Sequence, residues 1–371
     1  MIIMAKIAID ARQLRGTGVG RYLERLIHYL QKIDNENDYT ILLKPEDMSI
    51  WQPSNPHFVK LACPHKDFTI DEQIGFKKQL EELKPDLVHF GMVQQPIFYH
   101  GRVVTTMHDL TTVRFKNPDK NPLVFAIKQN VYVQVNKRVA KKSEEIIVPS
   151  QFVKDDIVKF TGVDPNKFTV TYEAADPITA QPEALTSLVD KDFIMYVGRP
   201  TPHKNLERLI DAFIELKNQY PNLHLVLAGK KDANYERIAA NVANRKIDKV
   251  VFMGFVTEGQ LRWLYEHCKA YIFPSLSEGF GLPGLEAMIH GAPVVSSNAT
   301  CLPEIYGNAA HYFNPIDTKD MATKISEVIS NEVLTKQLVN TGHLQVARYS
   351  WQAMAEQTYE IYSKVLGQTR S

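Results

Sequence analysis

The chain has 371 residues, 44% of them hydrophobic and 23% charged, with a formal net charge of +1 at pH 7. A chain of this length exceeds what one hydrophobic core usually serves, so we expect two domains. The balanced charge lacks the basic excess of nucleic-acid-binding proteins, and no nucleic-acid partner is expected. Three scattered cysteines, Cys63, Cys268 and Cys301, form no CxxC pair, which argues against a disulfide framework and a structural zinc site.

Neither a leader peptide nor a membrane span is predicted. Residues 1–10 lack the length and the cleavage site of a signal peptide. No stretch reaches the ~20 apolar residues that cross a bilayer. We therefore expect a cytoplasmic protein, in which any contact with the inner membrane face is peripheral.

Short β-branched runs alternate with segments of helical period along the chain. The predicted strands are Lys6–Asp10, 39–43, Leu87–Phe90, 103–107, Glu145–Val148, 169–172, Phe193–Val197, 223–228, 249–255, Ala270–Phe273 and 293–296. The predicted helices are 19–30, 206–216, 260–267, 283–290, 321–329 and Trp351–Leu366, the last with Ser350 as its candidate N-cap. This alternation predicts an α/β fold with parallel sheets, each covered by helices on both faces.

Two segments between these elements differ in composition. Residues 176–190 hold two prolines and few large apolar residues, and we interpret them as the linker between the halves. Residues 128–142 interleave Lys128, four further basic side chains and valines at helical spacing. Two interpretations of this segment stay open: a basic amphipathic helix that lies on an anionic membrane, or a core helix with a solvated charged face.

The strongest functional signal is the segment 277–288 (SEGFGLPGLEAM), which follows a predicted strand and opens a helix. Open parallel sheets bind ligands at the carboxyl ends of their strands, so two facing sheets would place two ligand sites across one cleft. Gly279 and Gly281 allow a ligand close to the backbone, and the helix start offers free N–H groups. Glu278 and Glu286 are good acceptors for sugar and ribose hydroxyls. The alternative is a plain βα turn with a glutamate favoured by the helix dipole.

The segment 196–205 (YVGRPTPHKN) likewise lies between a predicted strand and an amphipathic helix. Arg199 and Lys204 are close enough in sequence to converge on one anion, and arginine offers a bidentate fork to phosphate. Negative charge develops on a departing nucleoside diphosphate, where fixed cations act in the transition state. The alternative is a pair of solvated surface charges.

Two further strand ends carry candidate residues. The glycines at 16, 18 and 20 in the first turn (RGTGVGR) do not match the GxGxxG fingerprint, which disfavours a dehydrogenase. Contact of this turn with a phosphate or an acceptor, and tight packing of a helix on a sheet, both stay open. His108 ends a later strand, where it is placed to hydrogen-bond a sugar hydroxyl or a reacting centre. Its neighbour Asp109 is alternatively a helix or turn cap.

With these motifs in this order, the chain resembles the retaining glycosyltransferases of GT-B fold known as family 4, or group 1, and in particular their mannosyltransferase and rhamnosyltransferase members. The most specific mark is the E-x7-E pair of Glu278 and Glu286, joined to the GR…KN pattern of residues 198–205. The resemblance covers essentially the whole chain.

This resemblance implies two Rossmann-like, doubly wound parallel-sheet domains that face a cleft. The acceptor-side domain would span 1–178 and the nucleotide-sugar-binding domain 190–349. A C-terminal helix within 350–371 would cross back and complete the N-terminal domain.

The resemblance also implies roles for individual residues. Arg199 and Lys204 would hold the donor diphosphate and stabilise it as the leaving group. Glu278 would lie beside the donor sugar, and His108 would contact that sugar near its anomeric centre. Further donor-binding residues implied in this way are Gly16, Gly18, Gly198, Phe280, Gly281, Leu282 and, through the ribose hydroxyls, Glu286.

The implied reaction is a retaining hexose transfer that needs no metal or other cofactor. GDP-mannose is the expected donor, with UDP- and dTDP-sugars left open, and the expected acceptor is a glycan or lipid-linked glycan of a surface polysaccharide. The alternatives are another GT-B activity, such as a sugar-phosphate phosphorylase or synthase, and a catalytically inactive sugar-nucleotide-binding or scaffold protein.

Overall fold

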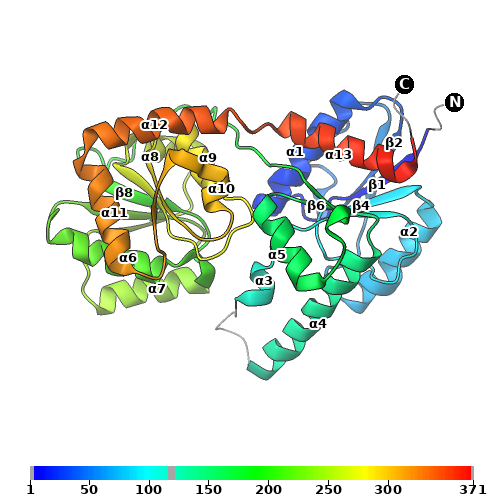
Figure 1. Ribbon diagram of the computed structural model, residues 1–371, viewed down its shortest axis with the longest axis horizontal. Helices are drawn as coiled ribbons and strands as arrows, with labels where there is room; N and C mark the ends of the chain where they lie inside the picture. The colour runs from blue at the N-terminus through cyan, green and yellow to red at the C-terminus, as the bar shows by residue number, and fades with distance from the viewer. Residues whose placement is uncertain (1–3, 116–121, 369–371) are drawn as a thin grey trace. The chain divides into compact units, whose positions relative to one another are not determined.

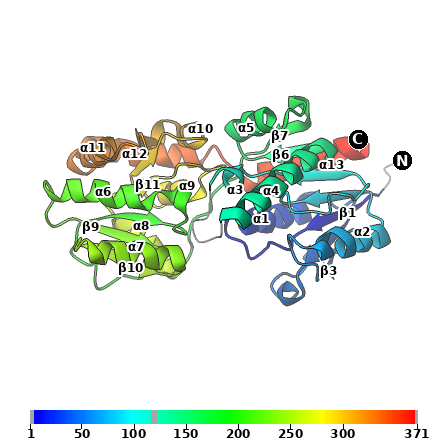
Figure 2. The same cartoon turned by 90° about the horizontal axis from the view of Figure 1, so that it is seen from below.

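The computed structural model describes residues 4–115 and 122–368, with only the backbone described for 122–128. The chain divides into two compact units. Unit 1 consists of Met1–Val113, Pro118–Glu173 and Ser350–Ser371, and unit 2 of Arg114–Asn117 and Ala174–Tyr349. Each unit is built around its own parallel sheet (Figures 1 and 2).

The sheet of unit 1 has seven strands in the order β3-β2-β1-β4-β5-β6-β7. They are β1 (Lys6–Asp10), β2 (Asp38–Leu43), β3 (Phe58–Ala62), β4 (Leu87–Phe90), β5 (Val103–Thr106), β6 (Glu145–Val148) and β7 (Phe168–Val170). Every neighbouring pair is parallel, and β1 registers Ile9 opposite Ile41 on one side and His89 on the other. All residues of β4, β5 and β6 are buried, because helices cover both faces of a parallel sheet.

The helices of unit 1 include the C-terminal one. They are α1 (Gly18–Ile33), α2 (Lys77–Leu83), α3 (Thr111–Arg114), α4 (Pro122–Lys142), α5 (Gln151–Thr161) and α13 (Trp351–Leu366). Figure 1 shows α13, in red, alongside α1, in blue. Ser150 and Ser350 cap α5 and α13 by accepting hydrogen bonds from Val153 N and Ala353 N. The predicted return of the C-terminal helix to the first sheet is therefore present.

The sheet of unit 2 has six parallel strands in the order β10-β9-β8-β11-β12-β13. They are β8 (Phe193–Val197), β9 (His224–Ala228), β10 (Val250–Gly254), β11 (Ala270–Phe273), β12 (Val294–Ser297) and β13 (Ala310–Phe313). Its helices are α6 (Leu206–Lys217), α7 (Ala233–Asn244), α8 (Glu258–His267), α9 (Leu282–Ile289), α10 (Leu302–Tyr306), α11 (Thr318–Ser330) and α12 (Glu332–Val346). Both strand orders reverse direction beside the first strand of the unit, which is the doubly wound topology expected from the sequence.

The basic segment is less amphipathic than its valine spacing indicates. Within α4, Val139 is fully buried but Val131 is 59% exposed, so the apolar stripe does not continue along the helix. The side chain of Lys128 lies outside the described residues. The end of α4 towards Lys142 is thus a core helix with a charged outer face, whereas the part around Val131 presents an apolar side chain to solvent.

Candidate functional site

The two strongest sequence motifs meet at the topological switch point of unit 2. One follows β8 and the other follows β11, and these are the adjacent strands at which the order reverses. Lys204 Nζ donates to Glu278 Oε1 at 2.6 Å, and the two side chains are only 18% and 13% exposed. The ammonium also lies 5.6 Å from the ring centroid of Phe273. Ligands of open α/β sheets bind at such a point. The structure thus has a paired cation and carboxylate at a position where a ligand is expected.

Asn205 ties the loops of this site together. It adopts left-handed backbone (φ 61°), which asparagine tolerates better than most residues, and it is buried. Its side-chain amide donates to the carbonyls of Pro274 at 3.0 Å and Pro315 at 2.7 Å. The sequence motif includes Asn205, but only the structure reveals that it fixes the loop that precedes Glu278.

Arg199 has a carboxylate partner different from that of Lys204. Its Nε donates to Asp232 Oδ2 at 2.9 Å, and its side chain is 64% exposed. Asp232 also caps α7 by accepting from Tyr235 N. Partial burial acts to raise the pKa of Asp232, but the hydrogen bond from Arg199 and the backbone N–H groups outweigh it and lower the pKa. Without a ligand, therefore, the structure does not show Arg199 and Lys204 converging on one anion.

Two glycines of the site have backbone that other residues rarely adopt. Gly198 has φ 149° and Gly281, the N-cap of α9, has φ 99°. A Cβ at Gly281 would lie 2.5 Å from the hydroxyl of Tyr306, which donates to the carbonyl of Gly281 at 2.6 Å. Both glycines therefore shape the turns that we predict from the sequence to bind the donor.

The remaining donor candidates lie on α9 and the turn before it. Phe280 is buried, with its ring edge-on to Tyr349 at 5.5 Å between centroids. Leu282 begins α9, and Glu286 lies in the second turn, partly exposed.

His108 lies in unit 1, directly after β5, with both ring nitrogens engaged. Nδ1 contacts Glu173 Oε1 at 3.2 Å and Nε2 contacts the carbonyl of Gly91 at 3.1 Å. The ring of Tyr22 lies edge-on at 5.0 Å. Burial acts to lower the pKa of His108, but the hydrogen bond and charge of Glu173 outweigh it and raise the pKa. Asp109 serves as a cap, accepting from Thr111 N at 2.8 Å.

The glycines of the first turn divide between packing and open space. A Cβ at Gly20 would lie 2.4 Å from the carbonyl of Leu14, and one at Gly16 would lie 2.9 Å from that of Gln13. A Cβ at Gly18 would meet nothing within 4 Å. Gly20 and Gly16 are thus required for packing, and Gly18 is where α1 begins with space around it.

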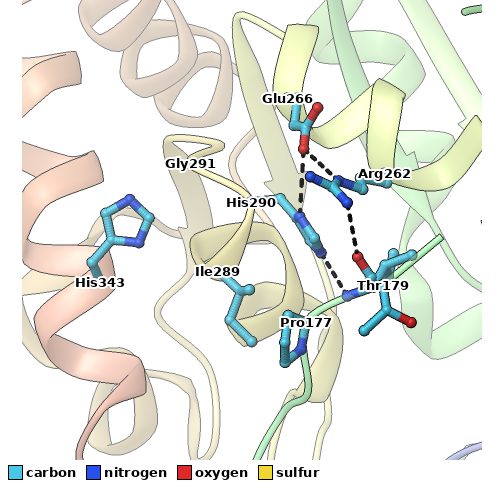
Figure 3. A pocket seen from close by; sticks show the side chains of 9 residues that line it. Pro177, Thr179, Arg262, Glu266, Ile289, His290, Gly291 and His343 are labelled. Carbon is cyan, nitrogen blue, oxygen red and sulfur yellow. Dashed lines mark hydrogen bonds and ion pairs between the residues drawn. The ribbon is translucent and has the colours of Figure 1, made fainter. Parts of the chain in front are cut away.

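An open pocket of about 550 Å³ in unit 2 is lined by none of the predicted site residues. Figure 3 shows His290 and Arg262 pointing towards the segment that follows Pro177. Ile178 N donates to His290 Nε2 at 3.0 Å, and Arg262 donates to the carbonyls of Ile178 and Ala180. Burial lowers the pKa of His290, which keeps Nε2 free to accept. The pocket therefore surrounds the hydrogen bonds that hold the first linker residues against α8 and the end of α9.

Across residues 4–115 and 122–368, no group of three or more His, Cys, Asp or Glu side chains is placed to hold a metal ion. In the same part of the chain, no helix is long and apolar enough to cross a membrane.

Comparison with known proteins assigns each half of the chain to a family. Residues 16–177 match the family described as Glycosyltransferase Family 4, and residues 178–345 match the Glycosyl transferases group 1. The serotype-specific mannosyltransferase WbdA of Escherichia coli is 32% identical over 92% of this chain and 45% of its own length. The E. coli O-antigen chain mannosyltransferase B is 28% identical over 71% of this chain and 73% of its own. The chain thus spans less than half the length of WbdA.

The fold also matches solved structures. A sucrose-phosphate synthase from Thermosynechococcus elongatus superimposes with a TM-score of 0.77 at 19% identity, covering 98% of this chain and 99% of that one. At this level of identity the likeness establishes the shared fold.

Proposed function

The chain belongs to the family 4, group 1 glycosyltransferases, and on that basis we propose that it transfers mannose from GDP-mannose to a growing surface glycan. The observation that carries the proposal is the Lys204–Glu278 pair at the switch point of unit 2, within the matched group 1 region. The names of the E. coli relatives supply the sugar and the polysaccharide setting.

The proposed reaction exchanges one bond at C1 of the mannose for another. The bond between the mannose C1 and the diphosphate oxygen breaks, and a bond from C1 to an acceptor hydroxyl forms on the same face. The acceptor proton leaves with the diphosphate. Lys204 and the exposed Arg199 offset the negative charge that develops on the leaving group, a task that a metal ion performs elsewhere. The proposed transfer retains the configuration at C1 because both bonds lie on one face, and it uses these two side chains in place of a metal ion.

Transfer assays with GDP-, UDP- and dTDP-sugars and a lipid-linked glycan acceptor test this proposal. GDP-mannose should give product with retained anomeric configuration, and EDTA should leave the rate unchanged. Lys204→Ala should lower turnover by about 10² to 10³, the usual loss for one preorganised charge or donor. Lys336→Ala, which removes an exposed lysine paired with Glu332, is the matched control. A preferred UDP- or dTDP-sugar, or loss of activity in EDTA, would refute the corresponding part.

We further propose that unit 1 contacts the inner membrane face peripherally. Several large apolar side chains are exposed on it: Phe68, Ile70, Ile74, Phe98 and Val131. Phe68 lies against Tyr132 of α4, and Arg138 of the same helix lies 4.8 Å from the Phe98 ring centroid. Apolar side chains beside a basic helix suit an anionic bilayer.

Sedimentation with vesicles tests this contact. Binding should require anionic lipid and should fall in Phe68→Ser combined with Ile70→Ser. Val333→Ser, which removes an exposed valine from unit 2, should bind like the unaltered protein. Equal binding to neutral vesicles, or none to either kind, would refute the proposed contact.

A further inference from the structure

The ring of His108 faces two hydrogen-bond acceptors. Nδ1 lies 3.2 Å from a carboxylate oxygen of Glu173, and Nε2 lies 3.1 Å from the carbonyl oxygen of Gly91. A neutral imidazole has one N–H, so its other ring nitrogen is an acceptor. One of the two contacts would then join a ring nitrogen lone pair to an oxygen acceptor, with no hydrogen between them. An imidazolium has two N–H groups and satisfies both.

We propose that Glu173 is a positioning residue that holds the His108 side chain as an imidazolium, with both ring N–H groups donated within unit 1. For its catalytic consequence this inference rests on the proposed transferase function. A histidine in this state has no lone pair and takes no proton from the acceptor hydroxyl. It contributes a fixed positive charge and orientation instead.

The other groups around the ring favour the same state. Asp109, the next residue, adds negative charge. His89 on β4 is fully buried; burial, with a smaller contribution from the charge of His108, lowers the pKa of His89 to about 3, so it stays neutral. Tyr22 on α1 is buried and its pKa is raised, so it carries no charge either. No second cation therefore opposes the one on His108 among these neighbours.

A buried chain of hydrogen bonds fixes the ring that packs on His108. Tyr362 of α13 bonds His89 Nδ1 at 2.5 Å, and His89 Nε2 bonds Thr106 at 2.8 Å. Thr106 in turn bonds the hydroxyl of Tyr22 at 2.8 Å. The C-terminal helix thus sets the position of Tyr22, which leaves the His108 imidazole little freedom to turn away from Glu173.

The test is the titration of His108 by NMR in protein with isotope-labelled histidine, with His108→Gln to assign its signal. Glu173→Gln keeps the shape of the side chain and removes its charge. It should lower the His108 titration midpoint by about one pH unit or more, a tenfold loss of proton affinity. Asp38→Asn, which removes the carboxylate 3.0 Å from Nδ1 of His57, should leave the His108 signal unchanged. An unchanged midpoint in Glu173→Gln overturns the proposal.

The pH profile of turnover separates this role from simple structural support. In Glu173→Gln the loss of turnover at high pH should begin at lower pH, by the same shift that NMR records. A uniform fall in turnover without a shift of the profile overturns the catalytic consequence. The NMR titration needs no donor or acceptor, so a failure to find transferase activity refutes the proposed function and leaves the charge of His108 as measured.

Discussion

The carboxyl edges of the two sheets differ in how far their charged side chains are buried. In unit 1, Asp10 at the end of β1 is buried, as are the nearby Arg12 and Glu72. Arg12, 1% exposed, binds Asp10 at 2.7 Å and Glu72 at 2.9 Å. In unit 2 the corresponding edge has glycine turns with positive φ and a largely exposed Arg199. The comparison indicates that a buried ion-pair network holds the first edge, whereas the second combines a mostly buried pair, Lys204 and Glu278, with a largely exposed cation, Arg199.

The largest expected effect is on the free energy of unfolding, where removal of Arg12 should cost much more than removal of Arg199. Arg12→Ala strands Asp10 and Glu72 without their cation inside the protein and should destabilise it by about 3–5 kcal/mol. Arg199→Ala breaks an exposed pair and should change the free energy of unfolding by less than about 1 kcal/mol while lowering turnover. Urea unfolding of both variants measures the difference. Similar stabilities for the two would contradict the contrast between the edges.

A glycine pair gives the next largest effect. Gly281→Ala forces alanine into left-handed backbone, with its Cβ 2.5 Å from the Tyr306 hydroxyl, and should cost about 2 kcal/mol or more. Gly18→Ala, with open space around its Cβ, should be neutral or stabilise α1 by up to about 1 kcal/mol. Thermal unfolding of the two variants decides the matter, and a stable Gly281→Ala would show that the turn tolerates a side chain.

Acid titration gives an effect that is smaller for each pH unit and that arises from His89 in unit 1. Because burial lowers the folded-state pKa of His89 to about 3, the unfolded chain binds a proton at higher pH than the folded one does. Stability should therefore fall by about 1.4 kcal/mol per pH unit from this group as the pH drops below about 6.5. His89→Gln should flatten the slope of unfolding free energy against pH between 6.5 and 4.5. Equal slopes would mean that His89 takes up its proton without unfolding.

The buried strands were predictable because each contains a short run of apolar residues. β1, β4, β6, β8 and β11 have the bounds that the sequence indicates. The edge strands β3 and β13 were not predicted. In β3, Val59, Lys60 and Ala62 face solvent at least in part, and the short run lacks a continuous apolar signal. The other two edge strands, β7 and β10, were predicted as 169–172 and 249–255, so the position at an edge does not by itself hide a strand.

The candidate site was predictable as motifs but not as contacts. The segments that contain Lys204 and Glu278 each follow a strand, and strand topology then brings them together. The partner of His108 was not predictable, because Glu173 is 65 residues away along the chain. Asp232, the partner of Arg199, is likewise 33 residues distant. Its sequence position is that of an ordinary helix cap, which gives no sign of a contact with Arg199. Local patterns identify the turn that carries a side chain, whereas long-range packing selects its partner.

We propose above that the switch point of unit 2, with Lys204 and Glu278, binds the donor diphosphate. Thermal unfolding with GDP-mannose, for the unaltered protein, Lys204→Ala and Lys336→Ala, tests it most directly. At ~100 times its dissociation constant the donor should add about 2.7 kcal/mol of stability, and only Lys204→Ala should lose this gain. An equal gain in Lys204→Ala, or none in the unaltered protein with any nucleotide sugar, would contradict the account.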